Sequence, residues 1–285
     1  MLVNLNQVLP KAQKEHYAVG LFNALNTEMA RGVIGAAEEL RSPVIMGSAE
    51  ILLPFSPLEC VCDAIKHMAR RTDVPVVLHY DHGLTFEKCM EALKLGFTSL
   101  MYDCSTDTYE ENVRKLAELT RIAHAFGATV EAELGHVGDN DHMEDDPTMQ
   151  DPSAFYTDPV QAKDFVNKTH VDALAIAVGT AHGAYRFTPK LDYDRIIAIR
   201  EAIPETPLVL HGGSGLSDDD FRQAIQCGIA KMNIFTDINV AGARAIREAV
   251  QSDKCAMTDL MNLQVEAVKA ETMKKMLLFG SQGKA

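Results

Sequence analysis

The chain of 285 residues is 47% hydrophobic and 24% charged, a composition typical of globular proteins that argues against a disordered chain. Its formal net charge of −13 leaves no basic surface to neutralise phosphates, so we expect neither nucleic acid nor an anionic membrane as a partner. The apolar runs are far shorter than the ~20 residues of a membrane span, and the N-terminal residues lack a signal-peptide pattern. We therefore expect a cytoplasmic location.

Short apolar runs alternate with amphipathic stretches along the chain. The eight runs, which we predict to be strands, are 17–23, 43–48, 75–82, 99–104, 129–134, 173–179, 207–212 and 231–237. The stretches between them have helical periodicity, and several end in glycine, as helices often do. Strands that alternate with helices form a parallel sheet, and eight repeats in about 250 residues predict an α/β fold, a closed (β/α)8 TIM barrel. An open doubly wound sheet is the runner-up.

Two segments depart from this alternation. Residues 135–159 are acidic, rich in glycine and proline, and too long for an ordinary connection, so we expect an active-site loop there. Residues 256–285 have a helical pattern and end in an apolar patch, which predicts a C-terminal helical extension that caps the barrel or meets a neighbouring subunit. No linker divides the chain, so we expect residues 1–285 to form a single domain.

Three of the predicted strand ends carry a histidine followed by glycine: His82, His182 and His211. The carboxyl ends of the strands form the active-site face of a TIM barrel. Three imidazoles that converge there can bind zinc and leave its fourth position open for substrate, so they predict a catalytic metal site. Each histidine taken alone could equally be a strand-end residue bonded to a carboxylate. The prediction rests on all three together.

Carboxylates accompany these histidines at Asp81, Asp103, Glu131 and Glu133, and carboxylates aimed into a barrel mouth need a cation or a proton. The glycine-rich residues 212–215 and the residues 233–236 fall where many barrels bind phosphate through backbone N–H groups. A plain tight turn is the alternative for the glycines. Together the two features predict a small phosphorylated substrate whose carbonyl or hydroxyl group meets the metal.

Four motifs stand at these strand ends in a fixed order: YDHG, EAELG, GTAHG and LVLHGGSGL. With KMNIFTD and the terminal LFGSQGKA they extend over nearly the whole chain. In these motifs the sequence resembles the class II, metal-dependent fructose-bisphosphate and tagatose-bisphosphate aldolases. The resemblance implies a zinc-dependent aldehyde-lyase of carbohydrate metabolism that reversibly cleaves a ketose 1,6-bisphosphate to dihydroxyacetone phosphate and an aldehyde. It also implies a homodimer or homotetramer.

The same resemblance implies how the metal is held. One zinc ion would be bound by His82, His182 and His211. Asp103 and Glu133 match positions associated with a second, displaced metal position. A monovalent cation, Na⁺ or K⁺, is implied near the phosphate-binding residues Gly183 and Ser214.

Catalytic and substrate-binding roles follow from the resemblance as well. Asp81 would exchange a proton with the C4 hydroxyl, and Asp141 aligns with the loop glutamate that takes the C3 proton in relatives. The residues implied in substrate or phosphate binding are Asn23, Gly183, Gly212, Gly213, Ser214, Asn233, Ile234, Phe235 and Thr236.

Three departures from the family pattern leave the substrate open. Asp141 is one methylene shorter than the family glutamate, and Phe235 replaces the aspartate of fructose-type and the alanine of tagatose-type relatives. No arginine follows Arg247 to bind a distal phosphate, a role that Arg186 could take instead. The alternative is therefore an aldolase for a ketose 1-phosphate with an unphosphorylated aldehyde partner. More distant alternatives are a metal-dependent phosphohydrolase and a non-catalytic subunit.

Overall fold

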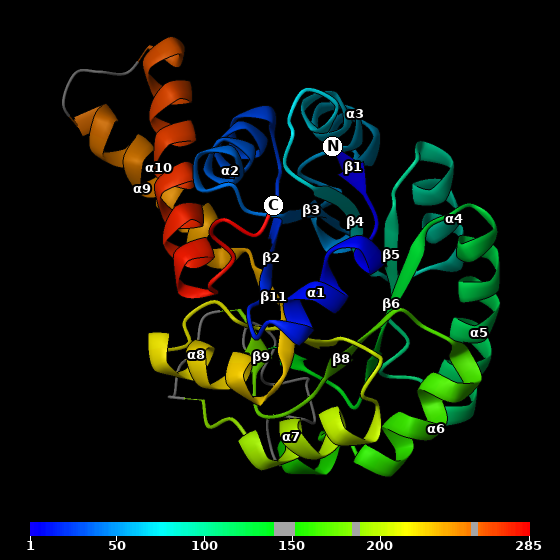
Figure 1. The fold of residues 1–285 in the computed structure, drawn as a ribbon. Helices are drawn as coiled ribbons and strands as arrows, with labels where there is room; N and C mark the ends of the chain where they lie inside the picture. Colours follow the sequence, from blue (N-terminus) through cyan, green and yellow to red (C-terminus); the bar gives the residue numbers. More distant parts are fainter. Residues whose placement is uncertain (140–151, 184–188, 252–255) are drawn as a thin grey trace.

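The computed structural model describes residues 1–139, 152–183, 189–251 and 256–285. Within these residues, eight parallel strands form a closed barrel surrounded by helices (Figure 1). The strands are β2 (Val19–Asn23), β3 (Val44–Ala49), β4 (Val76–Gly83), β5 (Ser99–Tyr102), β6 (Thr129–Leu134), β8 (Ala173–Ile176), β10 (Leu208–Leu210) and β11 (Ile229–Ile234). The ring closes because β4 pairs with both β3 and β5. The TIM-barrel prediction is confirmed, and the open sheet is wrong.

The observed strands overlap all eight predicted runs, with two notable differences. In the sixth run, β8 already ends at Ile176, and Gly179 beyond it adopts a φ of 110°. A separate short strand, β9 (Ala181–His182), then pairs with β7 (Gly138–Asp139). In the eighth run, the last residues already belong to helix α9, whose first turn contains Asp237, a favourable charge at a helix N-terminus.

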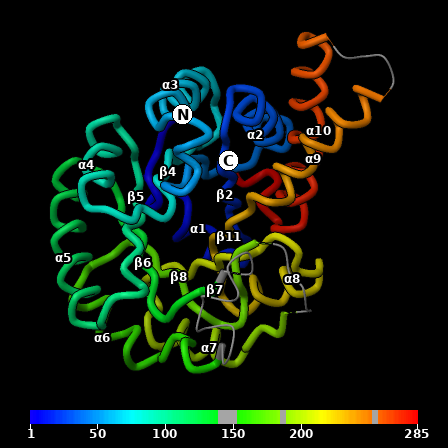
Figure 2. The backbone as a smooth tube through the Cα atoms, turned by 180° about the vertical axis from the view of Figure 1, so that it is seen from behind, coloured from blue at the N-terminus to red at the C-terminus, as the bar shows by residue number. Residues whose placement is uncertain are grey.

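The helices cover the outside of the barrel (Figures 1 and 2). They are α2 (Thr27–Leu40), α3 (Leu58–Ala69), α4 (Phe86–Leu95), α5 (Tyr109–Ala125), α6 (Pro159–Thr169), α7 (Tyr193–Ala202), α8 (Asp218–Cys227), α9 (Thr236–Gln251) and α10 (Met257–Leu278). Six of them begin at a side chain that accepts a hydrogen bond from the first turn: Asn26, Thr85, Thr108, Asp158, Asp192 and Ser217. These caps explain why each helix begins where it does after its strand.

The interior of the barrel changes from apolar to polar along the strands. At the amino ends, side chains such as Leu21, Val77 and Val209 pack with Leu5 and Leu9 from the N-terminal residues, which include β1 (Leu2–Val3) and α1 (Leu9–Lys14). The next inward positions toward the carboxyl ends are polar and buried, and include His79, Asp81, Glu131, Glu133, His211, Lys231 and Asn233. The apolar layer closes one end of the barrel, so the polar side chains gather at the other.

Gly47 of β3 lies beside His79 of β4 in the sheet, and a Cβ at this position would overlap the His79 carbonyl oxygen. We expect Gly47→Ala to lower the free energy of unfolding by about 3 kcal/mol or more, because the strand backbone has no room to move. Gly35→Ala on α2 is the control, since its Cβ would meet the Lys269 side chain at an ordinary 3.6 Å. There we expect no change or a gain of up to about 1 kcal/mol. Chemical denaturation of both variants measures the difference, and equal stabilities would contradict the close approach.

The C-terminal residues pack along the outside of the barrel. Helix α10 packs against α2 and α9, and in both views α9 and α10 extend beyond the ring of helices (Figures 1 and 2). After α10 the chain returns to the end of α2, where Ser42 Oγ donates to Ser281 Oγ at 2.8 Å and Ala285 N donates to Arg41 O at 3.0 Å. Within the described residues, none of the helices has the length and apolar character to span a membrane.

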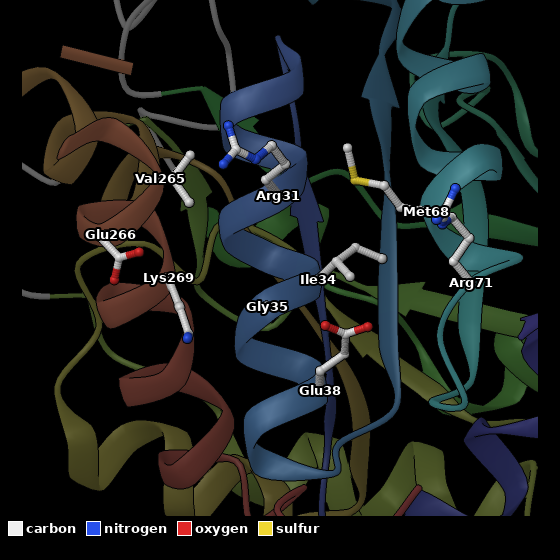
Figure 3. A pocket seen from close by; sticks show the side chains of 9 residues that line it. All are labelled: Arg31, Ile34, Gly35, Glu38, Met68, Arg71, Val265, Glu266 and Lys269. Carbon is white, nitrogen blue, oxygen red and sulfur yellow. The ribbon is translucent and has the colours of Figure 1, made fainter. Parts of the chain in front are cut away.

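A shallow groove lies on this outer face between α2, α3 and α10 (Figure 3). Its lining includes Arg31, Ile34, Glu38, Met68, Arg71 and Lys269. None of these residues belongs to the site predicted from the sequence, which lies inside the barrel mouth.

Candidate active site

The three histidines predicted as metal ligands come together at the carboxyl ends of the strands. His82 lies near the end of β4, His182 ends β9, and His211 directly follows β10. One ring nitrogen of each lies within 4.8 Å of the others. His82 adopts a left-handed backbone conformation with a φ of 42°. Such strain costs about 1–3 kcal/mol and is found preferentially at functional sites, and here it accompanies the convergence of the three rings.

Carboxylates orient two of these rings. Nδ1 of His82 donates to Asp103 at 2.8 Å, and Asp103 in turn accepts from the Ser105 hydroxyl at 2.7 Å. Nε2 of His211 donates to Glu131 at 2.9 Å. A carboxylate that accepts from one ring nitrogen leaves the other nitrogen as the free acceptor, which is how metal-binding histidines are usually oriented.

The atoms left over by these contacts fit a metal ion. Within the described residues, His82 Nε2, His211 Nδ1 and Glu133 Oε2 are buried and make no hydrogen bond of good geometry, although His211 Nδ1 and Glu133 Oε2 lie 3.2 Å apart. Buried polar atoms are rarely left without a partner, and a bound metal ion would satisfy all three. A second group consists of His82, Asp103 and Glu133, and one possible ligand atom of each lies within 4.8 Å of the others. Imidazole and carboxylate donors suit zinc and other divalent transition metals.

The charges around the histidines determine where protons lie in the metal-free protein. Burial opposes a charge on His82, but the carboxylates of Asp81 and Asp103 outweigh it and raise its pKa to about 10. Burial, together with His82 and His211, moves the pKa of His182 well below its ordinary value. Burial opposes the charge on Asp103 too, but its hydrogen bond with His82 holds the pKa well below the usual range.

These shifts predict proton release on metal binding. Because the pKa of His82 is raised to about 10, this residue keeps its proton at neutral pH and a metal must displace it. We expect zinc binding at about pH 7.5 to release at least about one proton per chain, and the affinity to rise with pH until His82 is deprotonated. Calorimetry in buffers of different ionisation enthalpy counts the protons. Binding without proton release would contradict the arrangement around His82.

Asp81 is held next to this group with both carboxylate oxygens engaged. It is 3% exposed, and its Oδ2 accepts from Asn23 Nδ2 at 2.8 Å while its Oδ1 accepts from Asn233 Nδ2 at 3.1 Å. Burial opposes its charge, but His82 and Lys231 outweigh burial and hold its pKa well below the ordinary value. Asp81 is therefore an ionised acceptor of fixed orientation, adjacent in sequence to His82.

The residues predicted to bind phosphate lie at the same end of the barrel. Residues 212–214 follow His211 after β10, and residues 233–236 run from the last two residues of β11 to the first residue of α9. Gly212 adopts a φ of 64°, and a Cβ there would overlap the backbone of Ala181, so glycine is required at this position. Asn23 ends β2, and Gly183 directly follows β9. Asp141 and Arg186 lie outside the described residues.

Only part of the predicted active-site loop is described, and both of its ends are attached to the barrel. The backbone N–H of His136 donates to Phe155 O at 3.1 Å, which joins the two ends of the loop. Thr157 N donates to Ala177 O at 3.0 Å, just beyond β8. His136 also contacts the Ser105 hydroxyl at 2.9 Å, so the first described part of the loop reaches the partner of Asp103.

Two buried residues near the site have no counterpart among the predicted site residues. Lys231 is fully buried and lies 2.8–2.9 Å from the Glu131 carboxylate. His79 is fully buried, with Nδ1 2.7 Å from Ser99 Oγ. The sequence feature that could have indicated them is the alternation of side chains along a strand. Polar residues two apart in an otherwise apolar run, as at 79 and 81 or 231 and 233, point to the same side of the strand.

Comparisons with known proteins agree with this geometry. A family model described as fructose-bisphosphate aldolase class-II matches residues 3–284. The chain belongs to this family. It is 40% identical to the uncharacterized protein YdjI of Escherichia coli K12 over the full length of both chains. It is 38% identical to the fructose-bisphosphate aldolase of Geobacillus stearothermophilus, covering 100% of this chain and 99% of that one.

Two solved structures whose titles name aldolases resemble the fold closely. The crystal structure of the YdjI aldolase from Escherichia coli K12 superimposes with a TM-score of 0.89 at 38% identity, covering 100% of both chains. A putative fructose-1,6-biphosphate aldolase from Coccidioides immitis gives a TM-score of 0.88 at 30% identity, covering 99% of this chain and 97% of that one. Membership of the class II family indicates an aldolase, a lyase that works with a divalent metal ion.

Proposed function

We propose that the protein is a zinc-dependent aldolase that reversibly cleaves a ketose 1,6-bisphosphate, of the fructose or tagatose type, to dihydroxyacetone phosphate and an aldehyde. One observation carries the proposal: the ionised Asp81 is fixed beside three histidines whose ring nitrogens lie within 4.8 Å of one another. A metal and an adjacent base are the two groups that retro-aldol cleavage requires. The name of the Geobacillus stearothermophilus relative supports the substrate class.

The proposal assigns one zinc ion to His82, His182 and His211. When bound, the ion would supply Lewis-acid polarisation of the substrate carbonyl. Asp103 orients His82 through the 2.8 Å hydrogen bond, and Glu133 offers a further ligand in the second group. These two carboxylates are the residues expected at a displaced metal position.

Asp81 takes the proton of the C4 hydroxyl as the C3–C4 bond breaks, and returns it in the reverse direction. The amide donors of Asn23 and Asn233 fix the plane of the carboxylate, so that proton transfer needs no rearrangement of Asp81. The low pKa keeps Asp81 in its basic form. The role of Asp141 at C3 stays a prediction.

The phosphate of the dihydroxyacetone phosphate half is assigned to the loops after β10 and β11. The residues are Gly183, Gly212, Gly213, Ser214, Asn233, Ile234, Phe235 and Thr236, with Asn23 at the end of β2. Thr236 begins α9, and α8 begins a few residues beyond the glycines, and helix N-termini of this kind often bind phosphate. The monovalent cation, the homo-oligomer, the single domain and the cytoplasmic location stay predictions.

The alternative is an aldolase that acts on a ketose 1-phosphate. It is favoured by the absence of arginine after Arg247, whereas Phe235, in the place of the family aspartate or alanine, leaves the configuration of the sugar open. Phe235 is partly buried and packs against the hydrophobic core, so it presents no group that binds a second phosphate.

A substrate panel decides between the two. Zinc-loaded protein is incubated with fructose 1,6-bisphosphate, tagatose 1,6-bisphosphate and several ketose 1-phosphates, and released dihydroxyacetone phosphate is followed by coupled reduction. We expect the highest kcat/KM with a bisphosphate. A higher value with a 1-phosphate would support the alternative, whereas release of inorganic phosphate without dihydroxyacetone phosphate would favour a phosphohydrolase and contradict the proposal.

A further inference from the structure

We propose that Lys231 is a positioning residue that orients both the metal ligand His211 and the base Asp81 from one point inside the barrel. The proposal rests on the function proposed above for these two residues. Lys231 lies on β11, is fully buried, and its ammonium reaches two side chains on different strands. It lies 2.8–2.9 Å from the carboxylate of Glu131 on β6 and donates to Asn233 Oδ1 at 2.8 Å.

Toward the metal site, Lys231 acts through Glu131. The same oxygen, Glu131 Oε1, accepts from Lys231 Nζ and from His211 Nε2, both at 2.9 Å. A carboxylate held by an ammonium group only accepts hydrogen bonds, so Nε2 of His211 must carry the hydrogen. The lone pair of the neutral ring is then on Nδ1, the buried nitrogen that lies 3.2 Å from the candidate ligand Glu133 and can bind the metal ion.

Toward the base, Lys231 acts through Asn233. An ammonium group has no acceptor, so the Asn233 carboxamide must turn its oxygen to Lys231 and its NH₂ group to Asp81. This NH₂ donates to Asp81 Oδ1 at 3.1 Å, while Asn23 donates to the other oxygen at 2.8 Å. If the amide were flipped, its oxygen would face the carboxylate and repel it. Lys231 thereby determines which way the amide that holds Asp81 points.

A simpler role is charge balance, in which Lys231 only neutralises the buried Glu131. The two roles differ in what restoring neutrality achieves. Lys231→Met removes the ammonium and leaves Glu131 with only its contact to His211, whereas the double variant Lys231→Met/Glu131→Gln removes both charges. The glutamine amide oxygen can still accept from His211 Nε2, so charge balance predicts that the double variant recovers stability, zinc affinity and turnover. Positioning predicts that it recovers stability but not turnover, because nothing then orients Asn233.

The experiment compares the wild type, these two variants and Lys269→Met. Lys269 is the control because it is also ion-paired, with Glu39 at 2.7 Å, but lies outside the barrel. For each protein the zinc affinity is measured by competition with a chromophoric chelator, the thermal unfolding midpoint is measured in the metal-free state, and kcat and KM are measured with the best substrate of the panel.

We expect Lys231→Met to lower the zinc affinity about 10- to 100-fold, as loss of an outer orienting partner does. We expect kcat to fall by at least about tenfold with KM within about threefold, in Lys231→Met and in the double variant alike, because the lost contacts position the reacting groups rather than bind substrate. The double variant, with no unpaired buried charge, should unfold near the wild-type midpoint, so the test does not depend on the folding of the single variant.

Wild-type kcat in the double variant, or wild-type zinc affinity and kcat in Lys231→Met, would overturn the proposal. If the wild type itself cleaves none of the sugar phosphates, the proposed function fails instead. The zinc affinities then still decide whether Lys231 orients His211, since they require no turnover.

Discussion

Asp81→Asn is expected to lower kcat for cleavage by about 10²- to 10⁴-fold, the range typical of a lost general acid or base. Asparagine has nearly the same shape, but it cannot take the proton of the C4 hydroxyl. Its single amide oxygen can accept a hydrogen bond from either Asn23 or Asn233, so one of the two bonds that hold Asp81 is lost. Steady-state cleavage assays with zinc-loaded protein measure the loss.

Asp63→Asn on α3 is the matched control, because the Asp63 side chain is 77% exposed and lies away from the barrel mouth. It should retain wild-type kcat. Zinc affinity of Asp81→Asn should stay within about tenfold of the wild type, since Asp81 is assigned to proton transfer and not to the ligand set. Undiminished cleavage by Asp81→Asn would remove Asp81 from the mechanism.

His182→Ala is expected to lower the zinc affinity by more than about 100-fold. This loss exceeds the one expected when a residue that only orients a ligand is removed, because His182 is itself a proposed ligand. Cleavage should fall to background for lack of the metal. Of the three histidines, His211 is fully buried and contacts two buried carboxylates, whereas His182 is partly exposed and so can be removed with less disruption. Metal analysis after dialysis and the chelator competition give the measurement.

His67→Ala serves as the control, because His67 is an exposed residue in the last turn of α3. Its zinc content and kcat should match the wild type. A His182→Ala protein that retains stoichiometric zinc and full activity would show that another residue completes the ligand set.

The fold was predictable because its signals are local. Buried strands of a parallel barrel are continuous apolar runs, and all eight were visible as such. The pairing of β7 with β9 was not predictable, since each strand has two residues and forms only when the barrel brings residues 138 and 181 together. Such short strands carry no periodicity that a sequence pattern can detect.

The candidate site was predictable to the extent that its residues stand at strand ends. His82, His182 and His211 attract notice as polar residues followed by glycine after apolar runs. Lys231 does not, because a lysine at the start of a predicted strand usually lies at the surface. Its partner Glu131 is 100 residues away in the chain, and only the closure of the barrel places the two on facing walls.

Cleavage should depend on a metal ion held at this site, and a zinc titration measures that dependence. The protein is stripped of metal with a chelator, zinc is added stepwise, and the release of dihydroxyacetone phosphate from the preferred substrate is recorded. We expect no release without metal and full release at about one zinc ion per chain. Full cleavage by protein shown to be free of metal, or none by protein shown to hold zinc, would contradict it.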